Sequence, residues 1–420
     1  MFRGFSQLFS KSNKDLRKRI FFTMFCVGLF CLGTTITIPW ASKIYQDLGF
    51  LEIFNLMSGG GLQNFSIFAL GVSPYITASI ITQLLQMDII PYFKELKDQG
   101  YVGRQKINKI TRYLSIVLAF VQAYALCLFY MNGLGTMEMI KTALVMTAGT
   151  SFCLWLGDEI TKKGIGNGTS MIIMAGIIQS MPGIFVGAYN SFIYGDFNLV
   201  MGIILFIIFV LVYVIVLVGI IYTQLSERRI PIQYSNRTTS AYGAQQSYLP
   251  IKLNSAGVMP VIFAQIILTV PSTIVAFTKN EAAMEFINKY IMYNTNTGML
   301  LYLLLIFFFG YFYTFMMMNP EEMSKNLNER GGYIPGIRPG EDTSKYISNS
   351  IGKLTVLGNI FIMIIAILPV LVSRISSLSS SVTIGGTGLL IVVGVAIETY
   401  KQIESSLLAR SYTEKRKRLR

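Results

Sequence analysis

The sequence contains no histidine and only four cysteines among its 420 residues. The cysteines all fall inside predicted apolar spans and show no metal-ligand spacing: Cys26, Cys31, Cys127 and Cys153. Neither a disulfide framework nor a zinc site is therefore indicated. Without histidine, a serine nucleophile would lack its usual base. A Ser–Lys arrangement with Lys141 or Lys279 remains open, but intramembrane catalysis is disfavoured.

Charged residues are scarce as well, at 13% of the chain. The acidic residues associated with spans lie near predicted cytoplasmic ends: Asp88, Asp158, Glu159 and Glu398. Proton relays and ion-coupled carriers usually place such groups inside their spans, so a carrier coupled through buried acids is disfavoured. No G-x-x-x-x-G-K-[ST] phosphate loop occurs. We expect no cofactor, and any motor must be a partner.

Long apolar runs are what the sequence has instead, since 53% of it is hydrophobic. The stretch from Leu199 to Tyr222 carries no charge and exceeds the roughly 20 residues that cross a bilayer as a helix. Ten such spans are predicted, near residues 18–39, 68–88, 110–131, 139–159, 170–189, 199–223, 256–278, 298–318, 354–373 and 382–400. The predicted fold class is therefore an all-α polytopic membrane protein.

The basic residues predict the orientation of these spans. An even number of spans puts both termini on one side, and the net charge is +14. If that side is the cytoplasm, it holds all of the 35 lysines and arginines except Lys43, Lys141, Lys279, Lys289 and Arg374. This asymmetry fits the positive-inside rule with cytoplasmic termini. The N-terminal arm resembles a signal peptide, but it lacks an obvious cleavage site, so we expect a retained first span.

Two features suggest more than a simple bundle. The piece from Phe50 to Ser66 is short, apolar and broken by Gly59, Gly60 and Gly61, which permit a sharp reversal. A re-entrant segment lining a cavity and an external loop with an interfacial helix fit it equally well. In addition, the pattern G-V-x-P-x-I occurs at Gly71–Ile76 and again at Gly257–Ile262. Such an echo in spans two and seven indicates two inverted halves of five spans with a pathway between them.

Five motifs carry a resemblance to a known family. They occur in family order: IFALGVSPYITASIITQLLQ at 67–86, GIGNGTS at 164–170, AGVMP at 256–260, NPEE at 319–322 and PGIRPGE at 335–341. Each motif alone is weak, but their joint occurrence over nearly the whole chain is specific. The chain resembles the SecY family, whose members pass unfolded polypeptides through an hourglass pore.

The resemblance implies a division of the chain into parts. Residues 1–17 would be a cytoplasmic arm, 18–189 the first half with a plug at about 50–66, 190–400 the second half with cytoplasmic loops at about 224–255 and 319–353, and 401–420 a basic tail. Six apolar residues would form the pore ring: Val72, Ile76, Ile173, Ile177, Ile262 and Ile391. Branched apolar side chains make a constriction that dewets and resists ions. Without the resemblance, each would more simply face lipid or a neighbouring helix.

Further roles follow from the same resemblance. The plug would include Phe54, Asn55, Gly59, Gly60, Gly61 and Asn64. The lateral gate would lie along spans two and seven, with Gln83 and Gln265 as its polar contacts, although packing hydrogen bonds worth about 0.6 kcal/mol explain them equally well. Docking of a motor or ribosome would use Arg237, Arg338 and Glu341. Arg237 stands alone where family members often carry adjacent basic residues.

The function expected is that of the central channel subunit of a Sec translocon in the bacterial plasma membrane. It would be a passive channel, not an enzyme. The expected partners are SecE- and SecG-like small membrane subunits, the SecA motor ATPase, the ribosome, signal peptides, nascent polypeptides and the phospholipid bilayer. The alternative from a different class is a solute-coupled secondary transporter with inverted repeats.

Overall fold

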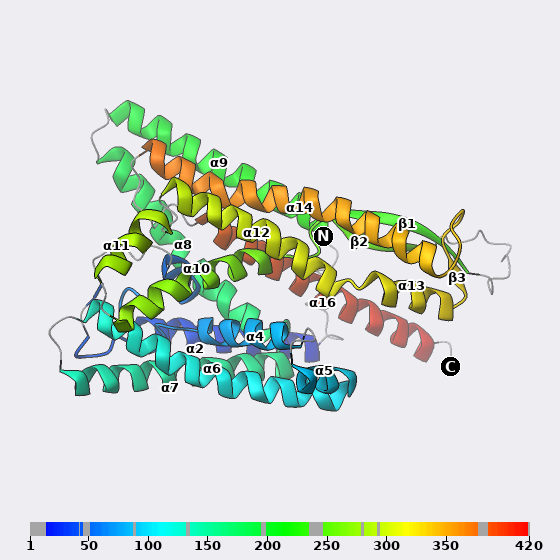
Figure 1. Ribbon diagram of the computed structural model, residues 1–420, viewed down its shortest axis with the longest axis horizontal. Coiled ribbons are helices and arrows are strands. Elements are labelled where there is room, and N and C mark those ends of the chain that lie inside the picture. Colours follow the sequence, from blue (N-terminus) through cyan, green and yellow to red (C-terminus); the bar gives the residue numbers. More distant parts are fainter. Residues whose placement is uncertain are drawn as a thin grey trace.

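The protein folds as a helical bundle with a small β-sheet at one end (Figure 1). The computed structural model describes residues 14–41, 43–44, 51–86, 90–131, 135–194, 199–234, 247–278, 281–291, 295–376 and 385–418. The long helices are α2 (Lys14–Thr35), α4 (Ser73–Leu85), α6 (Tyr101–Tyr130), α7 (Thr136–Lys163), α8 (Gly168–Ile193), α9 (Leu199–Leu225), α10 (Met259–Thr278), α12 (Asn296–Met317), α14 (Glu341–Ser376) and α16 (Gly385–Arg418). Short helices are α3 (Glu52–Met57), α5 (Pro91–Asp98), α11 (Glu281–Tyr290) and α13 (Pro320–Glu329).

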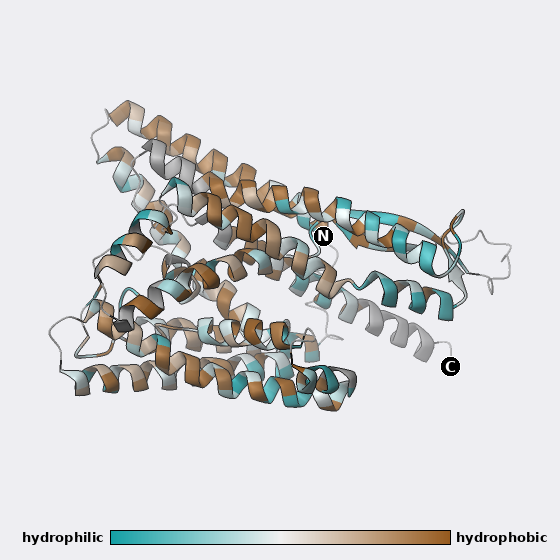
Figure 2. Ribbon diagram, viewed as in Figure 1, coloured by the Kyte–Doolittle hydropathy of each residue, from teal (hydrophilic) through white to brown (hydrophobic). Residues whose placement is uncertain are grey.

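A helix occupies each of the ten predicted ranges, and among the described residues six segments are long and apolar enough to cross a membrane. These are Tyr101–Tyr130, Thr136–Lys163, Gly168–Ile193, Leu199–Leu225, Asn296–Glu329 and Glu341–Leu368. The most apolar is α9, yet only 6% of its apolar window is buried inside the protein. Figure 2 shows hydrophobic residues along the length of α9. An exposed apolar helix of this kind needs lipid around it, so the protein is a multi-pass membrane protein.

The packing of the helices repeats along the chain. In the first half α4 packs on α6, α6 on α7, α7 on α8, and α2 on α8. The same four contacts recur in the second half as α10 on α12, α12 on α14, α14 on α16, and α9 on α16. The two sets meet where α8 packs against α9 and α16, and where α6 packs against α10. The echo seen in the sequence therefore has a counterpart in the packing.

The G-V-x-P echo also has a shared local structure. Gly71 and Gly257 both adopt left-handed backbone angles, with φ of 52° and 63°. Each is followed by a valine and then by a helix with proline at its second position, α4 and α10 respectively. Glycine suits the left-handed position because it has no Cβ, and proline suits the first helical turn because its missing N–H is not needed there.

Two connectors lead into these caps. The first connector, residues 36–72 between α2 and α4, contains α3 followed by a series of turns. Backbone hydrogen bonds tie its two arms together, with Ile38 N donating to Phe65 O and Ile67 N to Ile36 O. The second connector, residues 226–258 between α9 and α10, contains strands β1 (Glu227–Tyr234) and β2 (Ser247–Lys252).

The strands of the second connector form a sheet of order β2-β1-β3 with β3 (Gly332–Tyr333), all antiparallel. Register pairs Ile230 with Leu249 and Gln233 with Tyr333. Beneath the sheet lies a separate apolar cluster: Ile230, Ile232, Ile251, Leu327, Ile334, Ile347 and Ile351. This cluster joins the two predicted cytoplasmic loops into one unit beyond the apolar bundle, where Figure 2 turns hydrophilic.

Two predicted elements differ in extent from those observed. The span predicted at 68–88 contains only the 13-residue helix α4, because residues 67–72 form turns before the proline cap. The apolar character continues through those turns, so hydropathy alone could not locate the start of the helix. The region 224–255, predicted as a long polar loop, carries a β-hairpin whose alternation of Ile230 and Ile232 with exposed residues is a strand pattern.

Candidate functional site

The six predicted ring residues come together in one apolar cluster. Val72 caps α4, Ile76 lies on α4, Ile173 and Ile177 on α8, Ile262 on α10 and Ile391 on α16. Their side chains are between 3% and 8% exposed. Ile76 and Ile262 occupy the same position in the two G-V-x-P-x-I repeats, so the repeat delivers one isoleucine from each half. The arrangement is a buried apolar cluster built from four helices that are distant in the chain.

The first connector lies against this cluster. Met57, at the end of α3, belongs to the same cluster as the ring residues, and Phe54 packs against it. On the other side, Leu62 and Phe65 of the connector are buried with residues of α6 and α7. Phe65 has a φ of 46°, a strained value for a bulky residue that persists only where the surroundings enforce it. The connector is therefore packed into the bundle rather than lying outside it.

The predicted plug residues lie at α3 and in the turns that follow it. The buried Asn55 side chain accepts a hydrogen bond from Gln63 N at 3.0 Å, and the backbone oxygen of Asn55 accepts from Gly60 N at 2.8 Å. Asn64 Nδ2 donates to Gly60 O at 3.1 Å. Gly59 and Gly60 have φ of 68° and 79°. These bonds close the turn internally, which a polar backbone at membrane depth requires.

Two residues of α8 that receive this connector, Gly176 and Ser180, were not among the residues predicted from the sequence. Gly176 of α8 lies so close to Met57 O that a Cβ at this position would overlap the oxygen. One turn along, Ser180 Oγ is 3.3 Å from Leu56 O and 3.1 Å from Gly176 O. The spacing of Gly176 and Ser180 is the small-xxx-small pattern that allows close backbone approach in membranes, and this signal could have found them.

The two predicted gate glutamines lie in different environments. Gln83 on α4 is half-buried, and its Nε2 donates to Ser79 Oγ at 3.2 Å while its Oε1 is buried without a hydrogen-bond partner. Gln265 on α10 is buried. Near Gln83, Thr82 and Thr111 hydrogen bond across α4 and α6 at 3.0 Å. A polar seam therefore runs along α4, with one acceptor left unused.

Of the three predicted docking residues, two lie in the described part of the chain. Arg338 is exposed, and its backbone oxygen accepts a hydrogen bond from the buried Thr343 Oγ1 at 2.8 Å. Its guanidinium makes no ion pair with any residue that the structure describes. Glu341 pairs with Lys345 at 2.8 Å, one helical turn along. Arg237 lies outside the described residues.

Arg229 on β1, in contrast, is already paired. Arg229 Nε donates to Glu227 Oε1 at 2.9 Å, and its guanidinium lies 4.7 Å from the Tyr248 ring centre. The hydrogen bond to Glu227 is the main reason why the pKa of Arg229 is raised above its ordinary value. Arg338 differs from Arg229 because no described residue forms an ion pair with it, and arginine can bind carboxylate or phosphate bidentately.

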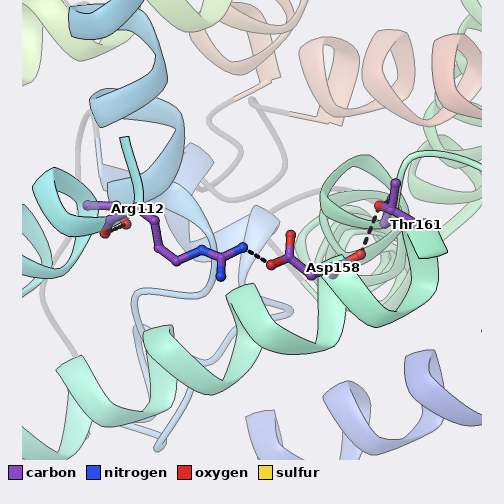
Figure 3. A network of polar contacts seen from close by, with 6 residues as sticks. Arg112, Asp158 and Thr161 are labelled. Carbon is purple, nitrogen blue, oxygen red and sulfur yellow. Dashed lines mark hydrogen bonds and ion pairs between the residues drawn. The ribbon is translucent and has the colours of Figure 1, made fainter. Parts of the chain in front are cut away.

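A polar network fixes the end of the bundle where α7 turns into α8. Arg112 of α6 forms an ion pair with Asp158 of α7, and Thr161 lies beside them (Figure 3). Thr161 Oγ1 donates to Gly157 O and accepts from Gly168 N. The ion pair uses Asp158, one of the acidic residues predicted to lie near the ends of the spans.

The same turn contains the GIGNGTS motif, which joins two further helices, α2 and α16. Thr23 of α2 accepts a hydrogen bond from Ile165 N at 3.0 Å, and Gln402 of α16 accepts from Gly166 N at 2.8 Å. Asn167 caps α8 by accepting from Thr169 N. The motif is thus a structural joint at this end of the bundle. No group of three or more metal-ligating side chains occurs in the described ranges.

Comparisons with known proteins give one consistent result. A family profile described as SecY matches residues 66–400. A protein translocase subunit SecY of Staphylococcus carnosus (strain TM300) is 42% identical over 426 residues, covering 98% of this chain and 99% of the relative. The protein of the same name from Staphylococcus aureus (strain NCTC 8325 / PS 47) is 43% identical over 413 residues, covering 95% and 96%.

Solved structures share the fold at lower identity. One described as a protein-conducting channel matches with a TM-score of 0.67 and 22% identity, covering 93% of this chain and 92% of the other. Sec61 from a canine ribosome–channel complex matches with a TM-score of 0.62 and 21% identity, with the same coverage. At these identities the likeness concerns the fold, and it extends over nearly the whole of both chains.

Proposed function

This chain belongs to the SecY family, and we propose that it is the protein-conducting channel subunit of a Sec translocase. In this role it passes unfolded secretory proteins across the membrane and releases apolar helices sideways into lipid. The family membership rests on relatives more than 40% identical over almost the full chain. The predicted alternative of a solute-coupled transporter receives no support from these comparisons.

One observation carries the mechanism, namely the convergence of the six ring residues. We propose that they form the seal of the pore. Isoleucine and valine offer no hydrogen-bonding groups, so they resist ions by dewetting and do not hold a passing chain by specific bonds. Because the ring draws on both halves through α4, α8, α10 and α16, a relative movement of the halves would widen it without unfolding any helix.

The finer assignments follow as parts of the same proposal. The first connector is the plug, resting against the ring from one side through Met57 and Phe54. The lateral gate runs where the first half meets the second at α4, α6 and α10, with Gln83 and Gln265 along it. An apolar segment leaves through this gate because its side chains gain by transfer to hydrocarbon, whereas a central charge costs roughly 2.5–3.5 kcal/mol.

The proposed setting is the bacterial plasma membrane, with both termini in the cytoplasm and two inverted halves of five spans. The sheet and α13 would then project into the cytoplasm, where Arg338 and Glu341 meet an external motor of the SecA kind or a ribosome. Arg237 belongs to the same proposed dock. SecE- and SecG-like subunits would complete the complex. The chain itself is passive, and the lack of an ion pair between Arg338 and any described residue supports this docking role.

A crosslinking experiment tests the proposed channel. In a background without the native cysteines, Ile76→Cys should crosslink to a nascent secretory chain stalled during translocation, because Ile76 lies in the ring. The matched control is Leu300→Cys on α12, since Leu300 is 61% exposed on the apolar surface. Crosslinks at both positions or at neither would contradict a pathway through the ring.

A further inference from the structure

We infer that Gly176 and Ser180 of α8 are positioning residues that hold the first connector against the ring and thereby keep the channel closed. This inference rests on the proposed function and adds a retaining site to it. The two residues share one face of α8 with Ile173 and Ile177, because positions i, i+3, i+4 and i+7 lie on the same side of a helix. One face of α8 therefore carries two residues of the ring and the two residues that contact the first connector. We call the contact surface formed by Gly176 and Ser180 the seat.

The contact at Gly176 is made by backbone alone. The Met57 carbonyl and the Gly59 N–H both lie where a Cβ of residue 176 would be. No flexible side chain is available to move aside, so even an alanine would push the end of α3 away from α8. The connector can reach its observed position only because residue 176 is glycine. Overpacking of this kind destabilises the position in which the connector contacts α8.

Ser180 adds a directional contact to this close approach. Its hydroxyl lies between Leu56 O at 3.3 Å and Gly176 O at 3.1 Å. The bond to Gly176 is internal to α8 and persists if the connector leaves. The bond to Leu56 exists only in the closed position. The Leu56 carbonyl, near the end of α3, also accepts from Gly59 N at 3.1 Å, so this hydroxyl is a second donor to it.

Gln179 supports the same seat from the adjacent face. Its Nε2 donates to Thr34 Oγ1 of α2 at 2.9 Å, which fixes the side chain between two helices. Its Oε1 lies 2.8 Å from where a Cβ of Gly59 would be. A residue larger than glycine at position 59 would therefore collide with a side chain that is already held. The seat thus selects a glycine on each side of the contact, Gly176 on α8 and Gly59 on the connector.

The experiment uses the purified channel with its membrane subunits in proteoliposomes and measures iodide efflux from the resting channel. Gly176→Ala should raise efflux at least about tenfold, because the closed position is overpacked. Ser180→Ala should raise it about threefold, as expected for one modest hydrogen bond, and Ser180→Thr should restore it. The control is Gly183→Ala, two turns along α8, where an added Cβ meets nothing within 4 Å.

A second readout separates positioning from general stability. Precursors with defective signal sequences should be translocated by the Gly176→Ala and Ser180→Ala channels, while precursors with intact signals are translocated as before. A merely structural role would lower both kinds of translocation together with the melting temperature. If Gly176→Ala does not fold, the Ser180→Ala and Ser180→Thr pair still tests the inference.

A deletion of residues 54–64 separates failure of the retaining site from failure of the proposed channel function. If the deletion raises efflux but Gly176→Ala and Ser180→Ala leave it at the wild-type level, the retaining site is refuted and the channel stands. If the deletion leaves efflux unchanged and the wild-type protein translocates no precursor, the proposed function itself fails. Elevated efflux in the deletion and in both substitutions, with Gly183→Ala unchanged, supports the inference.

Discussion

The two connectors occupy equivalent positions in the two halves, but the first is buried in the bundle and the second projects from it. Each follows the first helix of its half and ends at a left-handed glycine, Gly71 or Gly257, before a proline-capped helix. The first connector folds back into the bundle and contacts α8, α6 and α7. The second forms a hairpin with a cluster of its own beneath the sheet. Equivalent positions thus produce a buried element and a projecting one.

The cause lies in the residues before each cap. The first connector is largely apolar. Its glycine turns bring its backbone into contact with Gly176 of α8. Its strained Phe65 shows that packing with the bundle dominates over local preference. The second connector alternates the buried Ile230 and Ile232 with exposed residues, which is the pattern of a half-buried strand. Helix packing can therefore repeat while the connectors diverge, and the functional asymmetry resides in the connectors.

A matched pair of core substitutions should give the largest difference between the two connectors. Leu62 in the first connector is 1% exposed and Ile251 in the second is 0% exposed. Replacing either by alanine typically costs 2–5 kcal/mol. We expect Leu62→Ala to raise resting iodide efflux at least about tenfold, because it releases the buried connector. Ile251→Ala should leave efflux unchanged and impair motor-driven translocation of precursors.

The same effect of both substitutions on iodide efflux would contradict the expected difference between the connectors. Increased efflux from Ile251→Ala would mean that the sheet is part of the seal. Unchanged efflux from Leu62→Ala would mean that the first connector closes nothing. Thermal unfolding of both proteins serves as the control for stability, since both substitutions leave comparable cavities.

A charge reversal at Arg338 tests whether the projecting region binds a partner. Arg338→Glu should weaken binding of the motor or ribosome by about 10–100-fold, in line with the loss of a charge-assisted hydrogen bond. Efflux from the resting channel should not change. The measurement is a binding titration with purified partner, and the control is Lys141→Glu at the exposed start of α7. Equal losses for both variants would indicate a general charge effect.

The smallest effect is expected from the residue behind Arg338. Thr343 is 1% exposed and its Oγ1 donates to Arg338 O at 2.8 Å. Thr343→Val keeps the shape and removes this bond, so partner binding should weaken about fivefold. The same titration measures it. Binding as tight as that of the wild type would show that the turn holds Arg338 without this hydroxyl.

Much of the helical framework could be predicted from the sequence, because apolar length is a local property. Each predicted span contains a helix, and the G-V-x-P echo correctly indicated a repeat, which the helix packing bears out. The resemblance named six ring residues that lie in one cluster. Their role as a seal, and those of the plug, gate and dock residues, remain predictions.

What the sequence did not yield depends on contacts between distant residues. The small-xxx-small spacing of Gly176 and Ser180 is present in the sequence, but their contact with the first connector depends on how α3 lies against α8. The joining of Ile165 and Gly166 to Thr23 and Gln402 spans more than one hundred residues. The hairpin was missed for another reason, since charges in β1 obscured a two-residue alternation that was present in Ile230 and Ile232.

The left-handed glycines at the two caps also limit how the gene can vary. One base change in a glycine codon yields alanine, valine, serine, cysteine, aspartate, glutamate, arginine or tryptophan. Each of these has a Cβ, so each is strained at the φ of Gly71 and of Gly257. Asparagine, which tolerates this backbone best, cannot be reached in one step. We therefore expect both codons to change only synonymously in natural populations, although the segments that precede them are free to drift apart.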